Sequence, residues 1–167
     1  NQLMDLVRSV TDKPVQYAVH TCYPGDHSYG NYLLDDSVTI IQHVETHEFI
    51  QTHFEEDMQF MIGTFGADRG IENVVPTVAD ILVTDNSSIE VDLGNRIVEI
   101  TDFGFAQTGG DLFVCLPEEN VIWTGNPIVA EAPALPWLLD GHLIETLSTM
   151  QTVYNFLPEN SIVIPGH

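Results

Sequence analysis

The stretch HTCYPGDHSYGN, residues 20–31, decides how the rest of this chain is interpreted. It places Asp26 and His27 side by side, a carboxylate and an imidazole of the kind that bind divalent transition metals. Cys22 and Pro24 precede them at alternate positions, where a paired metal site would carry further ligands. A proline side chain has no donor or acceptor atom. The stretch therefore predicts a metal site of which one part is intact and another part is altered.

The segments before this stretch predict its position in a sheet. Apolar residues recur at helical spacing over residues 2–12, and Pro14 ends this pattern. Residues 15–19 follow as a short strand. The stretch thus begins at the C-terminal end of a strand, which is where open α/β sheets usually hold their sites.

Apolar periodicity predicts the remaining elements. A long amphipathic helix is expected over residues 45–61 and a glycine-rich connection over residues 63–79. A second helical pattern runs from Leu138 to Met150. Further apolar runs predict strands at residues 38–42, 81–83, 89–93, 97–100, 112–116, 121–124 and 162–164. This loose alternation predicts an α/β or α+β protein with a mixed sheet.

Composition limits the class of protein. The chain has 167 residues, of which 44% are hydrophobic, so we expect residues 1–167 to form a single domain. Four Lys and Arg against 25 Asp and Glu give a net charge of −21, which leaves no basic surface for nucleic acid. The apolar runs are too short to span a bilayer, so no membrane partner is expected. The compartment stays open, with the cytoplasm as the default.

Four short segments follow predicted strands in a fixed order. They are Cys22-x-Pro24-x-Asp26-His27, Gln107-Thr-Gly-Gly-Asp111, Thr124-Gly-Asn126 and Pro165-Gly-His167. Their order and spacing resemble the metallo-β-lactamase superfamily, in which these segments read His-x-His-x-Asp-His, Gly-His-Thr-x-Gly-Asp, Thr-Gly-Asp and Pro-Gly-His. Four ordered segments are a more specific signal than a lone Asp-His pair. The resemblance covers nearly the whole chain.

The run LPEENVIWTGNPIVAEAPALPWLLDGH, residues 116–142, is similar to one subgroup of this superfamily, the zinc hydrolases related to quinoprotein-associated and sulfur-oxidation proteins. The resemblance implies an αβ/βα sandwich of two mixed sheets, with the site at the edge between them. Family members have several strands before the first helix of this chain and further structure after its last histidine. The resemblance therefore implies that N-terminal strands are missing and that the domain is incomplete at both ends.

The first metal site of the superfamily is predicted to be lost. One zinc ion of the family is bound by the first two histidines of the first segment and the histidine of the second, positions held here by Cys22, Pro24 and Gln107. Pro24 offers no ligand atom and Gln107 only a neutral amide oxygen. A lone thiolate cannot hold an ion that takes three or four nitrogen or sulfur ligands. The resemblance thus implies a degenerate metal site.

The second metal site of the superfamily is predicted to survive in part. Its ligands correspond to Asp26, His27, Asn126 and His167. One carboxylate and two imidazoles with an open position can bind one zinc or another divalent transition metal. Asn126 removes a negative charge from this set, and Cys22 could compensate as a soft fourth ligand. Asp26 is the predicted catalytic residue as well as a ligand.

These assignments predict an acidic hydrolase-like protein that uses one ion to hydrolyse an ester, thioester or lactam of a small-molecule substrate. A second hypothesis is a catalytically inactive binding or scaffold protein of the same fold. A third makes Cys22 a nucleophile with His20 or His27 as its base. Asp26 could also serve only as the cap of a short helix. A homo-oligomer in which a neighbouring chain supports the incomplete fold is left open.

Overall fold

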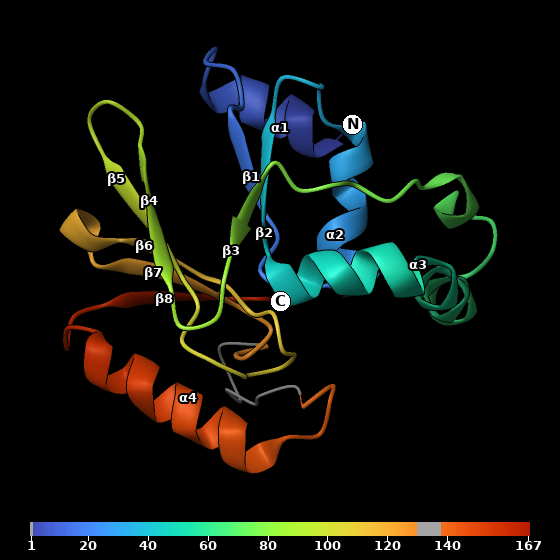
Figure 1. Ribbon diagram of the computed structural model, residues 1–167. Coiled ribbons are helices and arrows are strands. Elements are labelled where there is room, and N and C mark those ends of the chain that lie inside the picture. The colour runs from blue at the N-terminus through green and yellow to red at the C-terminus, as the bar shows by residue number, and fades with distance from the viewer. Residues whose placement is uncertain (1, 130–137) are drawn as a thin grey trace.

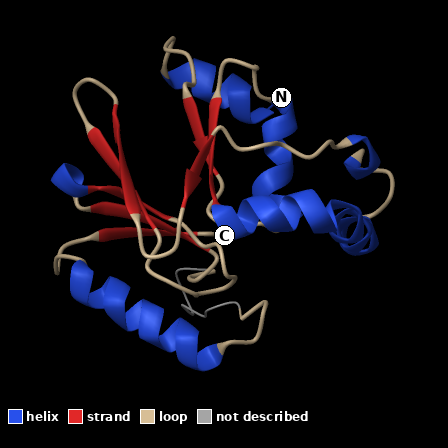
Figure 2. Ribbon diagram, in the orientation of Figure 1, coloured by secondary structure: helices blue, strands red, loops and turns tan. Residues whose placement is uncertain are grey.

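A computed structural model of the chain describes residues 2–129 and 138–167. It contains two β-sheets that face each other, with helices on their outer sides (Figure 1). Helix α4 (Leu143–Phe156) covers the larger sheet, whereas α1 (Gln2–Val10) and α3 (Val44–Phe65) lie on the side of the smaller one. The layers therefore follow the order helix, sheet, sheet, helix (Figure 2).

The smaller sheet has three parallel strands, in the order β1, β2, β3. They span Tyr17–Val19, Thr39–His43 and Ile81–Val83. Parallel neighbours need a crossover connection. The first crossover contains the single turn α2 (Gly25–Ser28) and the 3₁₀ helix η1 (Tyr29–Leu33), and the second contains α3 and the 3₁₀ helix η2 (Ile71–Asn73). The residues that follow β1, including Asp26, thus emerge at the C-terminal edge of this sheet.

The larger sheet has five strands in sequence order, β4 to β8. They span Ser88–Asp92, Ile97–Thr101, Phe113–Leu116, Val121–Gly125 and Ile162–Pro165, with the 3₁₀ helix η3 (Pro117–Glu119) between β6 and β7. The first four strands pair antiparallel, and β8 pairs parallel to β7 after the crossover through α4. The predicted mixed sheet is therefore confirmed.

Two apolar clusters hold the layers together. The first lies between the sheets and joins β2, β3 and the larger sheet through Ile41, Val83, Val91, Ile100 and Leu112. The second lies under α4 and contains Ala106, Phe113, Cys115, Ile122 and Val153. Because burial of apolar surface is the main favourable contribution to folding, these clusters set the spacing of the layers. The site segments lie at one edge of the first cluster.

Two predicted helix boundaries are wrong. The pattern from Leu138 predicts a helix that begins there, but α4 begins at Leu143 because Gly141 adopts a left-handed conformation with φ 77°. The pattern that ends at Met61 predicts a loop from residue 63, but α3 continues to Phe65. An isolated glycine inside a helix costs only about 1 kcal/mol, so Gly63 does not end it. Within the described ranges no helix is both long and apolar enough to cross a membrane.

Candidate metal centre

Asp26 and His27 lie in the single helical turn α2. Pro24 stands at the N-cap with φ −50°, and its carbonyl accepts two backbone N–H bonds of the turn, at 2.9 and 3.1 Å. Gly25 lets the turn pack closely, because a Cβ at this position would lie 2.7 Å from the ring of Tyr29. Pro24 and Gly25 therefore set the geometry of the turn, although neither offers a ligand.

His167 reaches the same place from the other sheet. It follows β8, and the backbone N–H groups of Gly166 and His167 donate to the carbonyls of Ile128 and Val129 at 2.9 and 2.8 Å. These bonds extend the pairing of β7 with β8 beyond both strands. Glycine is required at position 166 because a Cβ there would collide with the Oδ1 atom of Asn126. This backbone pairing brings a histidine far away in the sequence next to Asp26.

Asp26, His27 and His167 bring one atom each to a common point. The Asp26 Oδ2 atom lies 3.4 Å from His27 Nε2 and 3.3 Å from His167 Nε2, and the two Nε2 atoms are 3.2 Å apart. Ligands that surround zinc tetrahedrally at about 2.0–2.1 Å are about 3.3–3.4 Å from one another. The three atoms thus form a triangle of the size of one face of such a tetrahedron. We call these residues the ligand triad.

The ligand triad is partly open to solvent. The side chain of His27 is 13% exposed, that of Asp26 25% and that of His167 44%. The hydrogen bond with His27 lowers the pKa of Asp26, and partial burial opposes this shift. The carboxylate is therefore ionised at neutral pH. An ionised carboxylate beside two imidazole nitrogens is a donor set that suits zinc and similar divalent ions.

The expectation that Asp26 acts only as a helix cap is wrong. The N-cap of α2 is Pro24, and no side chain caps this turn. Asp26 instead lies inside the turn, where its side chain points toward the two histidines. Its position is thus explained by the triad rather than by the helix.

A loop over residues 106–111 forms the opposite part of the site. Asp111 organises it, because its Oδ2 atom accepts the backbone N–H groups of residues 106–108 at 3.3, 2.8 and 2.7 Å. The hydroxyl of Thr46 donates to the carbonyl of Gly110 at 2.8 Å, which attaches the loop to α3. Burial raises the pKa of Asp111 to about 7, against the backbone hydrogen bonds, which lower it. Asp111 therefore holds the loop in place.

Gln107 and Asn126 bury their side-chain amides near the triad. Each residue is only 1% exposed. Among the described residues, neither amide has a hydrogen-bond partner for its oxygen or its nitrogen. A buried polar group without a partner costs about 1–3 kcal/mol. Such atoms mark a place where a water molecule or a polar group of a ligand can bind.

Cys22 is fully buried and does not join the ligand triad. In the described part of the chain, the His, Cys, Asp and Glu atoms that lie within 4.8 Å of one another here are those of Asp26, His27 and His167. Burial, followed by the charge of Asp111, raises the pKa of Cys22 well above its usual value. The thiol is therefore protonated at neutral pH, the form that is a poor ligand and a poor nucleophile.

His20 is not available as a base for Cys22. Its ring nitrogens contact the side-chain amides of Gln42, at 2.8 Å from Nδ1, and of Asn31, at Nε2. Burial lowers the pKa of His20 to about 4, so the ring is neutral at physiological pH. Its contacts tie the 20–31 stretch to β2. The structure therefore does not support the hypothesis of a Cys22 nucleophile activated by His20.

An apolar pocket of about 410 Å³ opens beside Asp26, Gln107 and Asn126. One face of α3, with Phe49 and Phe60, forms much of its lining. Its volume lies within the range of small-molecule sites. Sequence reasoning missed this pocket, because apolar residues at helical spacing predict only a buried face. The exposure of Phe60, at 62%, is visible only in the structure.

A second group of possible ligand atoms lies at His43, Asp85 and Asp102. The His43 Nε2 atom is 3.4 Å from Asp85 Oδ1 and 3.9 Å from Asp102 Oδ2. His43 Nδ1, however, accepts the backbone N–H of Glu45 at 3.2 Å. The proton of the neutral ring must then sit on Nε2, which turns this atom into a donor rather than a metal ligand. This group therefore joins β2 to two loops and does not fit a metal ion.

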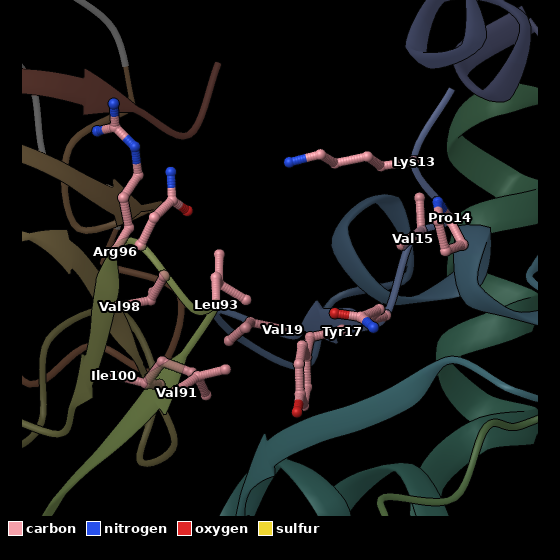
Figure 3. A pocket seen from close by; sticks show the side chains of 12 residues that line it. Lys13, Pro14, Val15, Tyr17, Val19, Val91, Leu93, Arg96, Val98 and Ile100 are labelled. Atoms are coloured by element: carbon pink, nitrogen blue, oxygen red, sulfur yellow. The ribbon is translucent and has the colours of Figure 1, made fainter. Parts of the chain in front are cut away.

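A hollow of about 600 Å³ lies between β1 and the β4–β5 hairpin (Figure 3). Apolar side chains such as Val19 and Val91 line it, and Lys13 and Arg96 stand on opposite walls. Its lining contains no histidine, cysteine or carboxylate. The hollow thus lacks groups for metal binding or acid–base chemistry. Of the two cavities, the one beside Asp26 has the composition of a reactive site.

Comparisons of sequence find no relative. No model of a known protein family matches the chain, and no curated protein sequence matches it either. Comparison of structures, in contrast, finds many solved chains of similar fold.

The similar structures include metallo-β-lactamases. The metallo-β-lactamase DIM-1 is 18% identical with a TM-score of 0.72, and the match covers 99% of this chain and 65% of that one. The metallo-β-lactamase from Pontibacter korlensis is 17% identical with a TM-score of 0.70, over 98% of this chain and 66% of that one. The sec-alkylsulfatase Pisa1 from Pseudomonas sp. is 13% identical with a TM-score of 0.72, over 99% of this chain and 31% of that one.

These likenesses show that the chain has the metallo-β-lactamase fold, as the resemblance of its four segments predicts. The chain spans about two thirds of the length of these metallo-β-lactamases and about a third of that of the sulfatase. At such low identity the likeness concerns the fold alone.

Proposed function

We propose that this protein is a metal-dependent hydrolase that binds one divalent transition-metal ion, zinc or a similar ion, at Asp26, His27 and His167. The observation that carries the proposal is the triangle of ligand atoms, with sides of 3.2–3.4 Å. Two segments far apart in the sequence supply these atoms: α2 supplies those of Asp26 and His27, and the segment after β8 supplies that of His167. This spacing equals that between the ligand atoms of a tetrahedral ion, and the three donors are the types that zinc takes.

The proposal assigns one ion per site rather than two. The positions that correspond to the first site of the superfamily hold Cys22, Pro24 and Gln107. Cys22 carries a protonated thiol, and Gln107 a neutral amide. Asn126, beside the triad, remains the candidate for a fourth ligand through its amide oxygen. We therefore propose that the first site is degenerate and that the second is retained.

A divalent ion bound by such a set lowers the pKa of a water molecule and polarises a carbonyl oxygen. Asp26 belongs to the ligand triad and also lines the apolar pocket, so it connects the ion with the substrate site. Gln107 and Asn126 line the same pocket and supply amide donors without partners. We propose esters, thioesters and lactams as substrates, because hydrolysis of each passes through an oxyanion that such donors stabilise.

We also propose the extent of the domain and the subgroup of the superfamily. Residues 1–167 form one domain, with both sheets sharing one core. The protein belongs with the subgroup related to quinoprotein-associated and sulfur-oxidation hydrolases. This second assignment rests on the run over residues 116–142, part of which lies outside the described residues.

Metal content tests the proposal directly. The purified chain is exposed to zinc, manganese or ferrous iron, freed of excess metal and submitted to elemental analysis. We expect one ion per chain, and a loss of this ion in the Asp26→Ala and His167→Ala variants. His53→Ala is the matched control, because this exposed histidine of α3 lies outside the triad. Cobalt substitution should give the absorption spectrum of a tetrahedral site.

The same preparations are then screened for hydrolysis of esters, thioesters and β-lactams. Turnover that needs added metal and is lost in Asp26→Ala would support the proposal. A chain that binds no ion and turns over none of these substrates would contradict it. That outcome would favour the alternative of an inactive binding or scaffold protein.

A further inference from the structure

The pocket beside the ligand triad combines aromatic rings with carboxylates. Four rings and three carboxylates belong to its lining. The rings are those of Tyr23, Phe49, Phe60 and Phe65, and the carboxylates are those of Asp26, Glu56 and Asp57. An ordinary apolar ligand pocket has only a small number of polar or charged groups. The charges of this lining are all negative.

The four rings differ in exposure. Tyr23 and Phe49 are half-buried and stack, with ring centroids 3.6 Å apart and an angle of 20° between their planes. Phe60 and Phe65, in the last turns of α3, are 62% and 48% exposed. Two large aromatic side chains exposed at the rim of a pocket offer their faces to a ligand.

The three carboxylates differ in their contact with solvent: Asp57 is half-buried, whereas Asp26 and Glu56 are more exposed. Asp57 accepts a hydrogen bond from the hydroxyl of Tyr29 at 2.7 Å. Burial raises the pKa of Asp57, and the neighbouring charge of Asp26 raises it further. Glu56 lies on the exposed side of the same helix. The ionised forms of these groups repel one another, and a positive charge among them would relieve this repulsion.

No basic side chain of the protein supplies this positive charge. The chain has four Lys and Arg residues in all, each within the described ranges, and none lines the pocket. The net charge of −21 raises the concentration of cations near the surface still further. A ligand that carries an anionic group would find no basic side chain in this lining to balance its charge.

We propose that this pocket binds an apolar organic cation, a substituted ammonium group, in preference to neutral or anionic groups of the same shape. Aromatic faces attract such cations, and quaternary ammonium groups are commonly held between aromatic rings. Glu56 and Asp57 supply the matching negative charge, since Asp26 is committed to the ligand triad. The inference deepens the proposed function by naming the substrate class, an ester or thioester with a cationic apolar group. Hydrolysis of such a substrate rests on the proposed function, whereas binding of the cation by the pocket does not depend on it.

Binding of three matched probes tests the proposal. Benzyltrimethylammonium is the cation, neopentylbenzene is its uncharged isostere, and phenylpropionate is an anion of similar size. Each is titrated into the full isotope-labelled chain and followed by amide chemical shifts. At low salt we expect the cation to bind about fivefold more tightly than the isostere, and the anion to bind at least about tenfold more weakly than the cation. The shifts should centre on residues 56–65.

Variants of α3 separate the contributions of charge and of rings. Glu56→Gln should weaken binding of the cation about threefold and leave the isostere unchanged. Glu55→Gln is the matched control, because it removes the same charge from the next residue, which does not line the pocket. Phe60→Ala should weaken both the cation and the isostere, whereas Tyr154→Ala, on the exposed side of α4, should weaken neither. All four positions are exposed, so these variants should fold.

Equal binding of cation and anion, or binding of the cation that neither Glu56→Gln nor Phe60→Ala weakens, would overturn the inference. The titrations are run on metal-free and zinc-loaded protein. If the chain prefers the cation but takes up no metal ion when zinc, manganese or ferrous iron is offered, the proposed function alone would be contradicted. If it binds one ion but shows no preference for the cation, this inference alone would be contradicted. Where esters are turned over, kcat/KM should be higher for acetylcholine than for its uncharged isostere, 3,3-dimethylbutyl acetate.

Discussion

The candidate centre has two halves, the ligand triad and the pair Gln107 and Asn126. They differ in how their polar groups are charged and exposed to solvent. In the ligand triad, an ionised carboxylate and two imidazoles converge at 3.2–3.4 Å, and each side chain keeps some contact with solvent. In the other half, Gln107 and Asn126 are neutral and almost completely buried. Charged groups can be brought close together only where water or a counter-ion stabilises them. Neutral amides can be buried at a lower cost in free energy. Of these two halves, the triad alone combines an ionised carboxylate with imidazole nitrogens, the donor set that suits a divalent cation.

The largest expected effect is on zinc affinity, which should fall strongly on substitution in the triad and little on substitution of Gln107. His27→Ala should weaken zinc binding at least about a thousandfold, because removal even of groups that only support ligands costs tenfold to a hundredfold. Gln107→Met should change zinc affinity less than about threefold, since it replaces an amide without partners by an apolar chain of similar shape. Competition with a chromophoric zinc chelator measures both constants. A large loss in Gln107→Met would show that the neutral half also binds metal.

The next effect concerns the pH dependence of stability. Burial lowers the pKa of His20 to about 4 in the folded chain, below its value of 6.5 in the unfolded chain. The stability that the neutral ring contributes is therefore present above pH 6.5 and is lost as the pH falls from 6.5 to 4. We expect this loss to be roughly 2–3 kcal/mol.

Urea unfolding of the wild type and of His20→Gln at several pH values measures this loss. The variant cannot titrate at this position, so its free energy of unfolding should fall less steeply over the same pH range. The carboxylates titrate in both proteins. The difference between the two slopes of unfolding free energy against pH therefore gives the contribution of His20. Parallel slopes would show that the buried ring does not resist protonation.

A smaller effect is expected when charge is returned to the neutral half. Asn126→Asp should raise zinc affinity about tenfold, since it adds a carboxylate beside the triad. Without metal, the same variant should unfold at a lower temperature than the wild type, because a buried carboxylate without a partner is costly. Thermal unfolding with and without zinc checks both effects. Asn120→Asp, at the half-buried turn before β7, is the control for added charge. No gain in affinity would place residue 126 outside the coordination sphere.

The smallest effect is expected at Cys22. If the protonated, buried thiol is not a ligand, Cys22→Ala should leave zinc affinity within about twofold of the wild type. Its stability should fall modestly, as for other small losses of buried volume. A cobalt complex of the wild type should accordingly lack the intense charge-transfer absorption of a thiolate ligand. Appearance of this band would show that the Cys22 thiolate binds the metal as a fourth ligand.

Much of the fold was predictable because it depends on local pattern. The sequence predicts each of the eight strands within the described ranges to within a few residues, since runs such as residues 38–42 are apolar enough to be buried on both faces. The start of α4 was missed, because the left-handed conformation of Gly141 is set by its surroundings and not by the periodicity of the leucines. The length of α3 was underestimated for a similar reason. Packing of Met61 and its neighbours outweighs the weak helix propensity of Gly63.

In the candidate site, too, some features follow from the sequence and others only from the tertiary structure. The sequence by itself determined the donor types, because Asp26, His27 and His167 stand in short motifs at strand ends, and it determined the acidic charge. The tertiary structure alone decided that these atoms meet, that Asp26 is no helix cap and that His43 carries its proton on Nε2. It also decided that aromatic rings and carboxylates of α3 share one pocket. Distances between groups far apart in the chain depend on how whole layers pack, and no local pattern contains that information.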